Sequence, residues 1–190
     1  MKHGKITVSK GNIIRFLADH FAELILGACY LVGLLIGLLG SFGQADIFCL
    51  FAGGDSFFRF LSNTLFPLTV FFFLAFFSGT SPLGMLSPLF LILFGLYSGR
   101  SVALFTAAHA YWQYLLFACP VLVLSVSLLI KQLQEGISLS MRLFQLCIGG
   151  GAADLSIRFK AFLLRCLIGF SAVAAGCVLV SGIRFYLFAV

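Results

Sequence analysis

Charged side chains are scarce in this chain. Only 9% of its 190 residues are Asp, Glu, Lys or Arg, whereas about 25% is typical of soluble domains. Hydrophobic residues make up 62%, against an ordinary share of about 45–50%. This balance excludes an ordinary soluble domain, so we expect an integral membrane protein.

Residue patterns for metal, redox or phosphate chemistry are also missing. The six Cys include no Cys-x-x-Cys pair, and His3, His20 and His109 do not have the spacing of zinc ligands. The glycine run 149–151 lacks the Lys and the Ser or Thr that complete a phosphate-binding loop. Ionisable residues are nearly absent from the apolar runs, so no proton relay is visible. We therefore expect no bound metal and no cofactor.

The apolar residues form five runs along the chain. A helix needs about 20 apolar residues to cross the hydrocarbon layer of a membrane. We therefore expect one all-α membrane domain over residues 1–190, a polytopic bundle of about five transmembrane helices. The predicted spans cover residues 21–42, 64–78, 85–97, 115–130 and 161–182, with Pro120 kinking the fourth.

The basic residues predict how these spans are oriented. Lys and Arg outnumber Asp and Glu by 12 to 6, and they gather in residues 1–20 and 131–160. By the positive-inside rule, the basic N-terminal segment and an amphipathic loop at 131–160 face the cytoplasm, and five crossings place the C-terminal tail outside. Because this charge lies between spans, we expect contact with membrane lipid and no binding of nucleic acid.

A break interrupts one of the most apolar stretches at residues 76–90, FFSGTSPLGMLSPLF. Gly79, Pro82 and Gly84 predict the turn of a helical hairpin, because glycine permits unusual backbone angles and Pro82 can start the next helix. Both flanking spans are short by the length rule. Two arrangements stay open: a hairpin that crosses completely, and a re-entrant loop buried in protein or lining water.

Two glycine pairs have the small-xxx-small spacing of close helix contacts. Gly33 and Gly37 lie in the first span, and Gly95 and Gly99 lie in the third. Such faces let helix backbones approach each other. We expect them to contact other membrane proteins or further copies of this chain. Residues 43–63, which fit an amphipathic element at the outer interface, are a second expected contact surface.

Two other functions are compared, an intramembrane serine hydrolase and a small-molecule transporter. Ser98 beside Gly99 is a partial match to an intramembrane serine hydrolase, but His109 follows only eleven residues later, and no pair of oxyanion donors precedes it. We therefore expect no enzyme activity. The alternative is a membrane substrate-binding or permease subunit of a small-molecule transporter. The binding component of an energy-coupling vitamin transporter is similar in length and in its few charges.

The layout resembles the bacterial stage II sporulation protein M family, mainly over residues 13–130. The resemblance is carried by Asn63 before the second span, by Gly79 with Pro82 or Pro88 around the break, and by the segment Gly95-Leu-Tyr-Ser-Gly99. In that family a basic residue commonly stands near the first glycine of this segment. Here the place is taken by Phe94, and Arg100 is the nearest charge.

This resemblance implies a non-enzymatic scaffold in the bacterial cell membrane. Such a protein would sit at the septum between mother cell and forespore. Its partners would be the peptidoglycan hydrolases that drive engulfment during sporulation. Because Phe94 stands where that family commonly has a basic residue, the resemblance does not extend to a charge-mediated role of the turn.

Overall fold

The computed structural model describes residues 21–40, 56–81, 84–107, 112, 114–147 and 155–188. The described residues form helices and turns and contain no strand, so the all-α prediction is confirmed. Five of the helices are long and apolar enough to cross a membrane, as the sequence predicted. Residues 1–20, the 43–55 part of the expected interfacial element and the glycine run 149–151 lie outside the described ranges.

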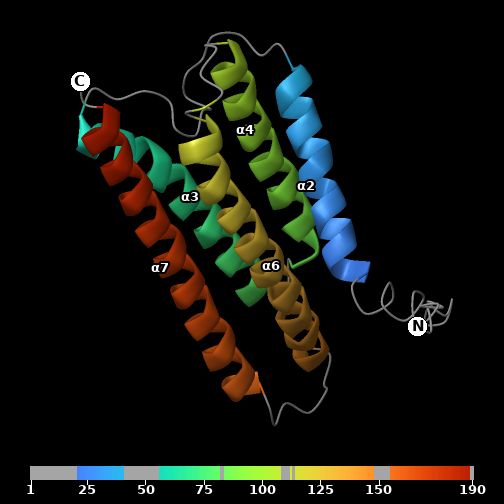
Figure 1. Cartoon of the computed structure of the whole chain (residues 1–190). Helices are drawn as coiled ribbons and strands as arrows, with labels where there is room; N and C mark the ends of the chain where they lie inside the picture. The colour runs from blue at the N-terminus through green and yellow to red at the C-terminus, as the bar shows by residue number, and fades with distance from the viewer. Residues whose placement is uncertain are drawn as a thin grey trace, which may run out of the picture.

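The helices alternate in direction through the bundle. Gly33 packs on Ile92 and Gly37 packs on Leu96, so the helices that contain these residues run parallel. The first and third spans of a bundle with alternating directions have this relation. Figure 1 shows α2 and α4 side by side along one flank of a group made by α3, α6 and α7. Which end faces the cytoplasm stays a prediction. The elements are α2 (Phe21–Leu39), α3 (Phe57–Thr80), a 3₁₀ turn η2 (Gly84–Leu86), α4 (Ser87–Ala107), a π-helical turn η3 (Tyr114–Ala118), α6 (Cys119–Cys147) and α7 (Leu155–Phe188).

Both helices around the break are longer than predicted. α3 begins at Phe57 because Ser56 caps it, its side chain accepting a hydrogen bond from the backbone N–H of Arg59 at 3.4 Å. The 24 residues of α3 and the 21 residues of α4 are each about 30 Å long or more. Both helices are therefore long enough to cross the hydrocarbon layer, which favours the crossing hairpin over the re-entrant loop.

The third span is longer than the predicted residues 85–97. α4 continues past Arg100 to Ala107, and the Arg100 side chain is only 8% exposed. The neighbouring serines do not interrupt the helix, because the hydroxyls of Ser98 and Ser101 donate to carbonyls one turn earlier at 2.8 and 3.0 Å. Both hydroxyl protons are thereby donated within the helix itself.

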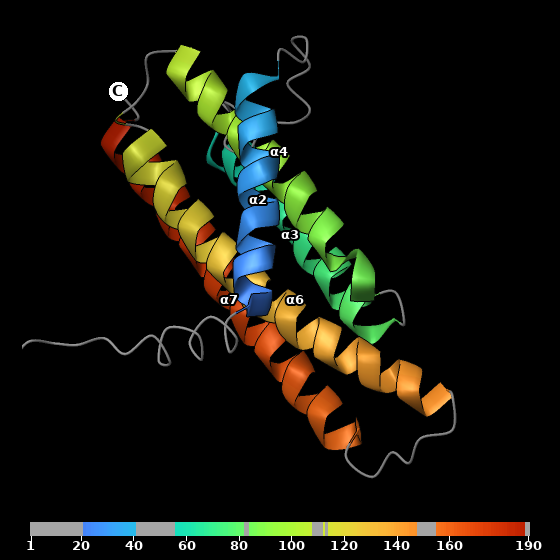
Figure 2. The ribbon, with the colours of Figure 1, turned by 90° about the vertical axis from the view of Figure 1, so that its right-hand side faces the viewer.

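The segment 131–160 is not the separate loop predicted from its charges. Residues 131–147 continue α6 without a break, and Gln132, Leu133 and Leu139 are buried. α7 already begins at Leu155. Figure 2 shows α6 and α7 running past the α3–α4 turn. The amphipathic pattern therefore belongs to a continuation of α6 that keeps its apolar side in the bundle.

The kink predicted at Pro120 corresponds in the structure to a π-helical turn that ends two residues before the proline. Residues Tyr114–Ala118 are π-helical, and regular α6 starts at Cys119. Proline has no N–H to donate to the preceding turn, and its ring crowds that turn. A π-helical turn is one way in which a helix accommodates such a residue.

The α2–α4 contact joins backbone to backbone through four glycines. A Cβ atom added to Gly33 would lie 2.8 Å from the carbonyl carbon of Ile92, and one added to Gly95 would lie 2.8 Å from the backbone nitrogen of Leu34. No larger side chain fits there unless the helices separate. The close approach also permits weak Cα–H···O contacts between the two helices. The glycines that make this seam are Gly33, Gly37, Gly95 and Gly99.

The α3–α4 turn docks on α6 in a similar way. A Cβ atom on Gly79 would lie 2.8 Å from the Cα atom of Gly136, so α3 and α6 meet backbone to backbone at this point. Next along the chain, the N–H of Gly84 donates to the hydroxyl of Ser140 at 3.0 Å. The turn is thus attached to α6 by one close contact and one buried hydrogen bond.

Hydroxyl groups close the turn from inside. The side chains of Ser78 and Ser87 are hydrogen-bonded at 2.9 Å, and the Ser87 hydroxyl lies 2.6 Å from the carbonyl oxygen of Gly84, to which it donates. Both serines are buried. Pro82, expected to start the next helix, lies outside the described residues.

Replacing Gly33 by Ala tests the glycine seam. The added methyl group meets the backbone of α4, so we expect the free energy of unfolding to fall by about 1–3 kcal/mol, the usual cost of overpacking. The control is Gly27→Ala in the same helix, where nothing lies within 4 Å of the added atom. It should be neutral or stabilising, because Ala is the better helix former. Unfolding in detergent micelles measures both, and equal effects would contradict the seam.

Replacing Ser140 by Ala tests the attachment of the turn. The change leaves the buried N–H of Gly84 without its acceptor, at a cost of about 1–3 kcal/mol. We expect the Gly84 amide to exchange its hydrogen faster with solvent deuterium. Ser138→Ala, an exposed position on the same helix, is the control and should leave the exchange unchanged. An unchanged exchange rate at Gly84 in the Ser140 variant would refute the attachment.

Candidate functional site

The residues singled out in the sequence lie at contacts within the chain. The glycines of α2 and α4 face one another, so neither face is open to a further helix. The glycines of the turn are covered by α6, and the arginine is buried in α4. A partner expected on these faces therefore needs another surface. The residues concerned are Gly33, Gly37, Gly79, Gly84, Gly95, Gly99 and Arg100, with Pro82 outside the described ranges.

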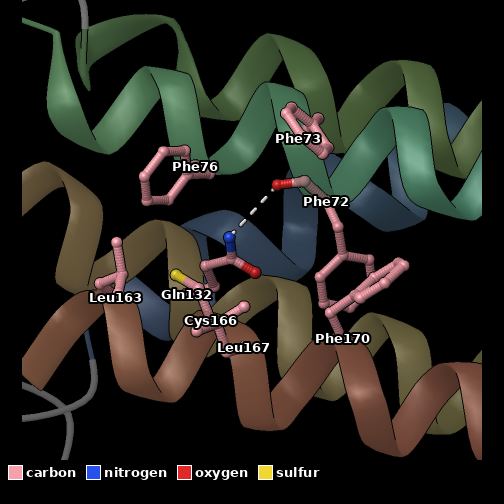
Figure 3. A pocket seen from close by; sticks show the side chains of 8 residues that line it. All are labelled: Phe72, Phe73, Phe76, Gln132, Leu163, Cys166, Leu167 and Phe170. Carbon is pink, nitrogen blue, oxygen red and sulfur yellow. Dashed lines mark hydrogen bonds between the residues drawn. The ribbon is translucent and has the colours of Figure 1, made fainter.

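A pocket lies between α3 and α7, and α6 contributes to its lining (Figure 3). Its volume is about 200 Å³. Most of the lining is aromatic or aliphatic, and one amide side chain adds a polar group. The lining residues are Phe72, Phe73 and Phe76 from α3, Gln132 from α6, and Leu163, Cys166, Leu167 and Phe170 from α7.

Two aromatic pairs hold α3 and α7 apart along the pocket. The ring centroids of Phe72 and Phe170 are 6.1 Å apart in an edge-to-face arrangement. One turn further along, Phe76 and Phe162 stack with centroids 5.9 Å apart. Phe72 and Phe76 are four residues apart on α3, and Phe162 and Phe170 are eight apart on α7, so each helix presents its rings to the other from about one side. Because the rings bridge the two helices, α3 and α7 cannot close on the space between the pairs.

Gln132 supplies the amide of the pocket. Its side chain is 8% exposed, and its Nε2 donates to the backbone carbonyl of Phe72 at 3.3 Å. No hydrogen bond from the described residues reaches its amide oxygen. Figure 3 shows that oxygen turned away from the Phe72 carbonyl, on the side of Phe170. A polar group in an apolar membrane setting is stabilised by a hydrogen-bond partner, so this oxygen is suited to accept from an occupant of the pocket.

The pocket opens sideways from the bundle. Phe73 is 59% exposed and Leu167 is 56% exposed, and both lie in segments long and apolar enough to span a membrane. Side chains at that position face lipid or another membrane protein. The opening therefore lies on the surface that such a span presents to lipid.

The polar groups expected to carry chemistry do not gather here. Ser98, the candidate nucleophile, is fully buried in α4, and its hydroxyl donates to the carbonyl of Phe94. His109, the candidate base, lies outside the described residues. Among the described residues no group of three His, Cys, Asp or Glu side chains could hold a metal ion. The pocket combines apolar walls with one amide, which is an arrangement for binding.

No protein-family model, curated protein or solved structure matches this chain. The resemblance to the stage II sporulation protein M family stays a prediction from the residues named above.

Sequence reasoning missed every residue that lines the pocket. The aromatic residues of α3 were visible as a run, but a run of Phe in a membrane span is ordinary lipid-facing composition. Gln132 carried the better signal, because an amide beside a span must find a hydrogen-bond partner. Assigning residues 131–160 to a surface loop hid that signal.

Gln132→Leu removes the amide and keeps a side chain of similar size. Hydrogen bonds between transmembrane helices contribute about 0.6 kcal/mol on average and about 1.7 kcal/mol at most. We therefore expect the free energy of unfolding in micelles to fall by less than about 2 kcal/mol. Gln134→Leu, on the same helix and outside the pocket, should have a smaller effect. A gain in stability would show that the bond to Phe72 contributes nothing.

Proposed function

We propose that this chain is a non-enzymatic scaffold in the membrane, and that it holds a second membrane protein through the pocket between α3 and α7. The observation that carries this proposal is a preformed, side-opening pocket with an amide among its apolar walls. A helix of the partner would lie along the exposed rim and place one large side chain in the pocket. Interfaces of this kind obtain most of their binding energy from a few such anchored residues.

The size of the pocket favours a side chain over a whole metabolite. Pockets for small molecules usually enclose about 300–1,000 Å³. At about 200 Å³, this pocket is below that range. The volume suits a single aromatic or long aliphatic side chain. The alternative expected from the sequence, a substrate-binding subunit of a transporter, would need more room than the pocket has.

The walls of the pocket support tight binding because they are fixed before a partner arrives. The two aromatic pairs already set the spacing of α3 and α7. A preformed pocket avoids the cost of ordering side chains on binding. The amide oxygen of Gln132 would add specificity, since a Tyr, Trp, Ser or Thr of the partner could donate to it.

The finer form of the proposal rests on the sequence resemblance alone. In that form the membrane is the bacterial cell membrane, and the scaffold holds peptidoglycan hydrolases at the septum during engulfment. A hydrolase with a transmembrane anchor would supply the helix that the pocket requires. Association with further copies of this chain is the other form that the same surface allows.

Filling the pocket with a larger side chain tests the scaffold. We expect Leu167→Trp to reduce recovery of the membrane partner by at least about tenfold, because loss of an anchored contact costs about 2 kcal/mol or more. The matched control is Leu164→Trp, which has the same chemistry on the same helix at 57% exposure and does not line the pocket. The measurement is crosslinking affinity purification from native cells with quantitative mass spectrometry.

If the pocket is the contact, the partner is lost from the Leu167→Trp variant and retained by the Leu164→Trp variant. Partners that are retained in both variants, or lost in both, would contradict the proposal. Recovery of an ATPase pair with a second membrane subunit, retained in both variants, would support the transporter instead. Recovery of peptidoglycan hydrolases that depends on Leu167 would support the finer form.

A further inference from the structure

A second hollow lies between α6 and α7, in the part of these helices nearest their junction. Its volume is about 220 Å³. The stacked rings of Phe76 and Phe162 stand between it and the pocket described above, because Phe76 lines the pocket and Phe162 lines this cleft. The cleft is therefore a separate feature.

Positive charge dominates the cleft. Arg142, Arg158 and Arg165 line it together with one carboxylate, that of Glu135. Arg165 and Glu135 form an ion pair. Among the described residues no carboxylate pairs with Arg142 or Arg158. Three guanidinium groups thus share the cleft with one carboxylate, which leaves an excess of two positive charges among its described residues.

The cleft lies at the level where the bundle leaves the hydrocarbon layer. Phe162 contacts the end of α3, since a Cβ atom on Gly79 would lie 2.7 Å from its ring. Ser140 of α6 binds the α3–α4 turn at Gly84. The 24 residues of α3 cover about 36 Å, enough for the hydrocarbon core, so this turn lies at the membrane interface. Lipid phosphates occupy the same level.

The lining combines apolar and basic surface. Leu139 and Phe162 are buried and form apolar parts of the cleft wall, while Arg142 and Arg158 are exposed. A free phosphate ion would use only the basic groups. A phospholipid would use both, because its phosphate joins glycerol and acyl chains that lie along apolar side chains.

We propose that this cleft binds a phosphate group, and that the phosphate belongs to the headgroup of an anionic phospholipid. The guanidinium groups of Arg142 and Arg158 donate to the phosphate oxygens, for which the planar fork of arginine is well suited. Basic pockets between transmembrane helices are the usual sites for such headgroups. The site lies at the end of the bundle that we expect to face the cytoplasm. This inference does not depend on the proposed scaffold.

Lipid titration tests the site. Purified protein in detergent micelles is titrated separately with phosphatidylglycerol and with phosphatidylcholine, and bound lipid is counted by native mass spectrometry. We expect R142Q combined with R158Q to weaken phosphatidylglycerol binding at least about tenfold, since hydrogen bonds to charged groups each contribute more than a factor of ten. The control is K131Q combined with K160Q, which removes the same charge from exposed positions outside the cleft. Circular dichroism checks that all variants stay helical.

Each outcome decides the question. Loss in the arginine pair with retention in the lysine pair supports the site. Equal loss in both pairs means diffuse attraction by surface charge and overturns it. Equal binding of phosphatidylglycerol and phosphatidylcholine by the unmodified protein also overturns it. Full competition by millimolar inorganic phosphate would assign the cleft to a soluble phosphate and would reject the lipid.

Discussion

Backbone contact at glycines is the interaction on which the rest of the bundle depends. In a membrane, helices gain little by hiding apolar surface, because lipid is as apolar as they are. Close packing must supply the attraction, and its strength rises as backbones approach. The seam between α2 and α4 and the contact of Gly79 with Gly136 give that approach. The first contact joins α2 to α4, and the second joins α3 to α6.

The pocket follows from an imbalance around α3. On the side of α6, glycine meets glycine and the backbones touch. On the side of α7, Phe72 and Phe76 meet the rings of Phe170 and Phe162, whose centroids lie about 6 Å away. A helix held closely on one side and at ring distance on the other leaves a wedge of space. The pocket occupies that wedge, so the small and large residues together determine it.

Hydropathy was enough to predict the number and type of the helices but not their ends. Length and apolar content identify a span, whereas ends depend on caps and on tertiary contacts, as with Ser56 at α3 and the buried Arg100 in α4. The spacing of Gly33 and Gly37 showed that a backbone would come close, but not that α4 of the same chain would be that backbone. Pocket residues could not be predicted, because a pocket arises between helices whose relative placement no single segment encodes.

The polar side chains differ in whether their hydrogen-bond partner comes from the same helix or from a neighbouring helix. Buried hydroxyls such as Ser125 and Ser181 donate to carbonyls of their own helix, so they need no partner helix at that depth. Gln132 needs one, and it takes the carbonyl of Phe72 across the α3–α6 contact. Full charges cost most in hydrocarbon, and the paired side chains of Arg165 and Glu135 are both exposed, at 67% and 37%. Because an amide is the intermediate case, one hydrogen bond across the α3–α6 contact is enough for Gln132 to lie buried in the bundle, and no described residue donates to its oxygen.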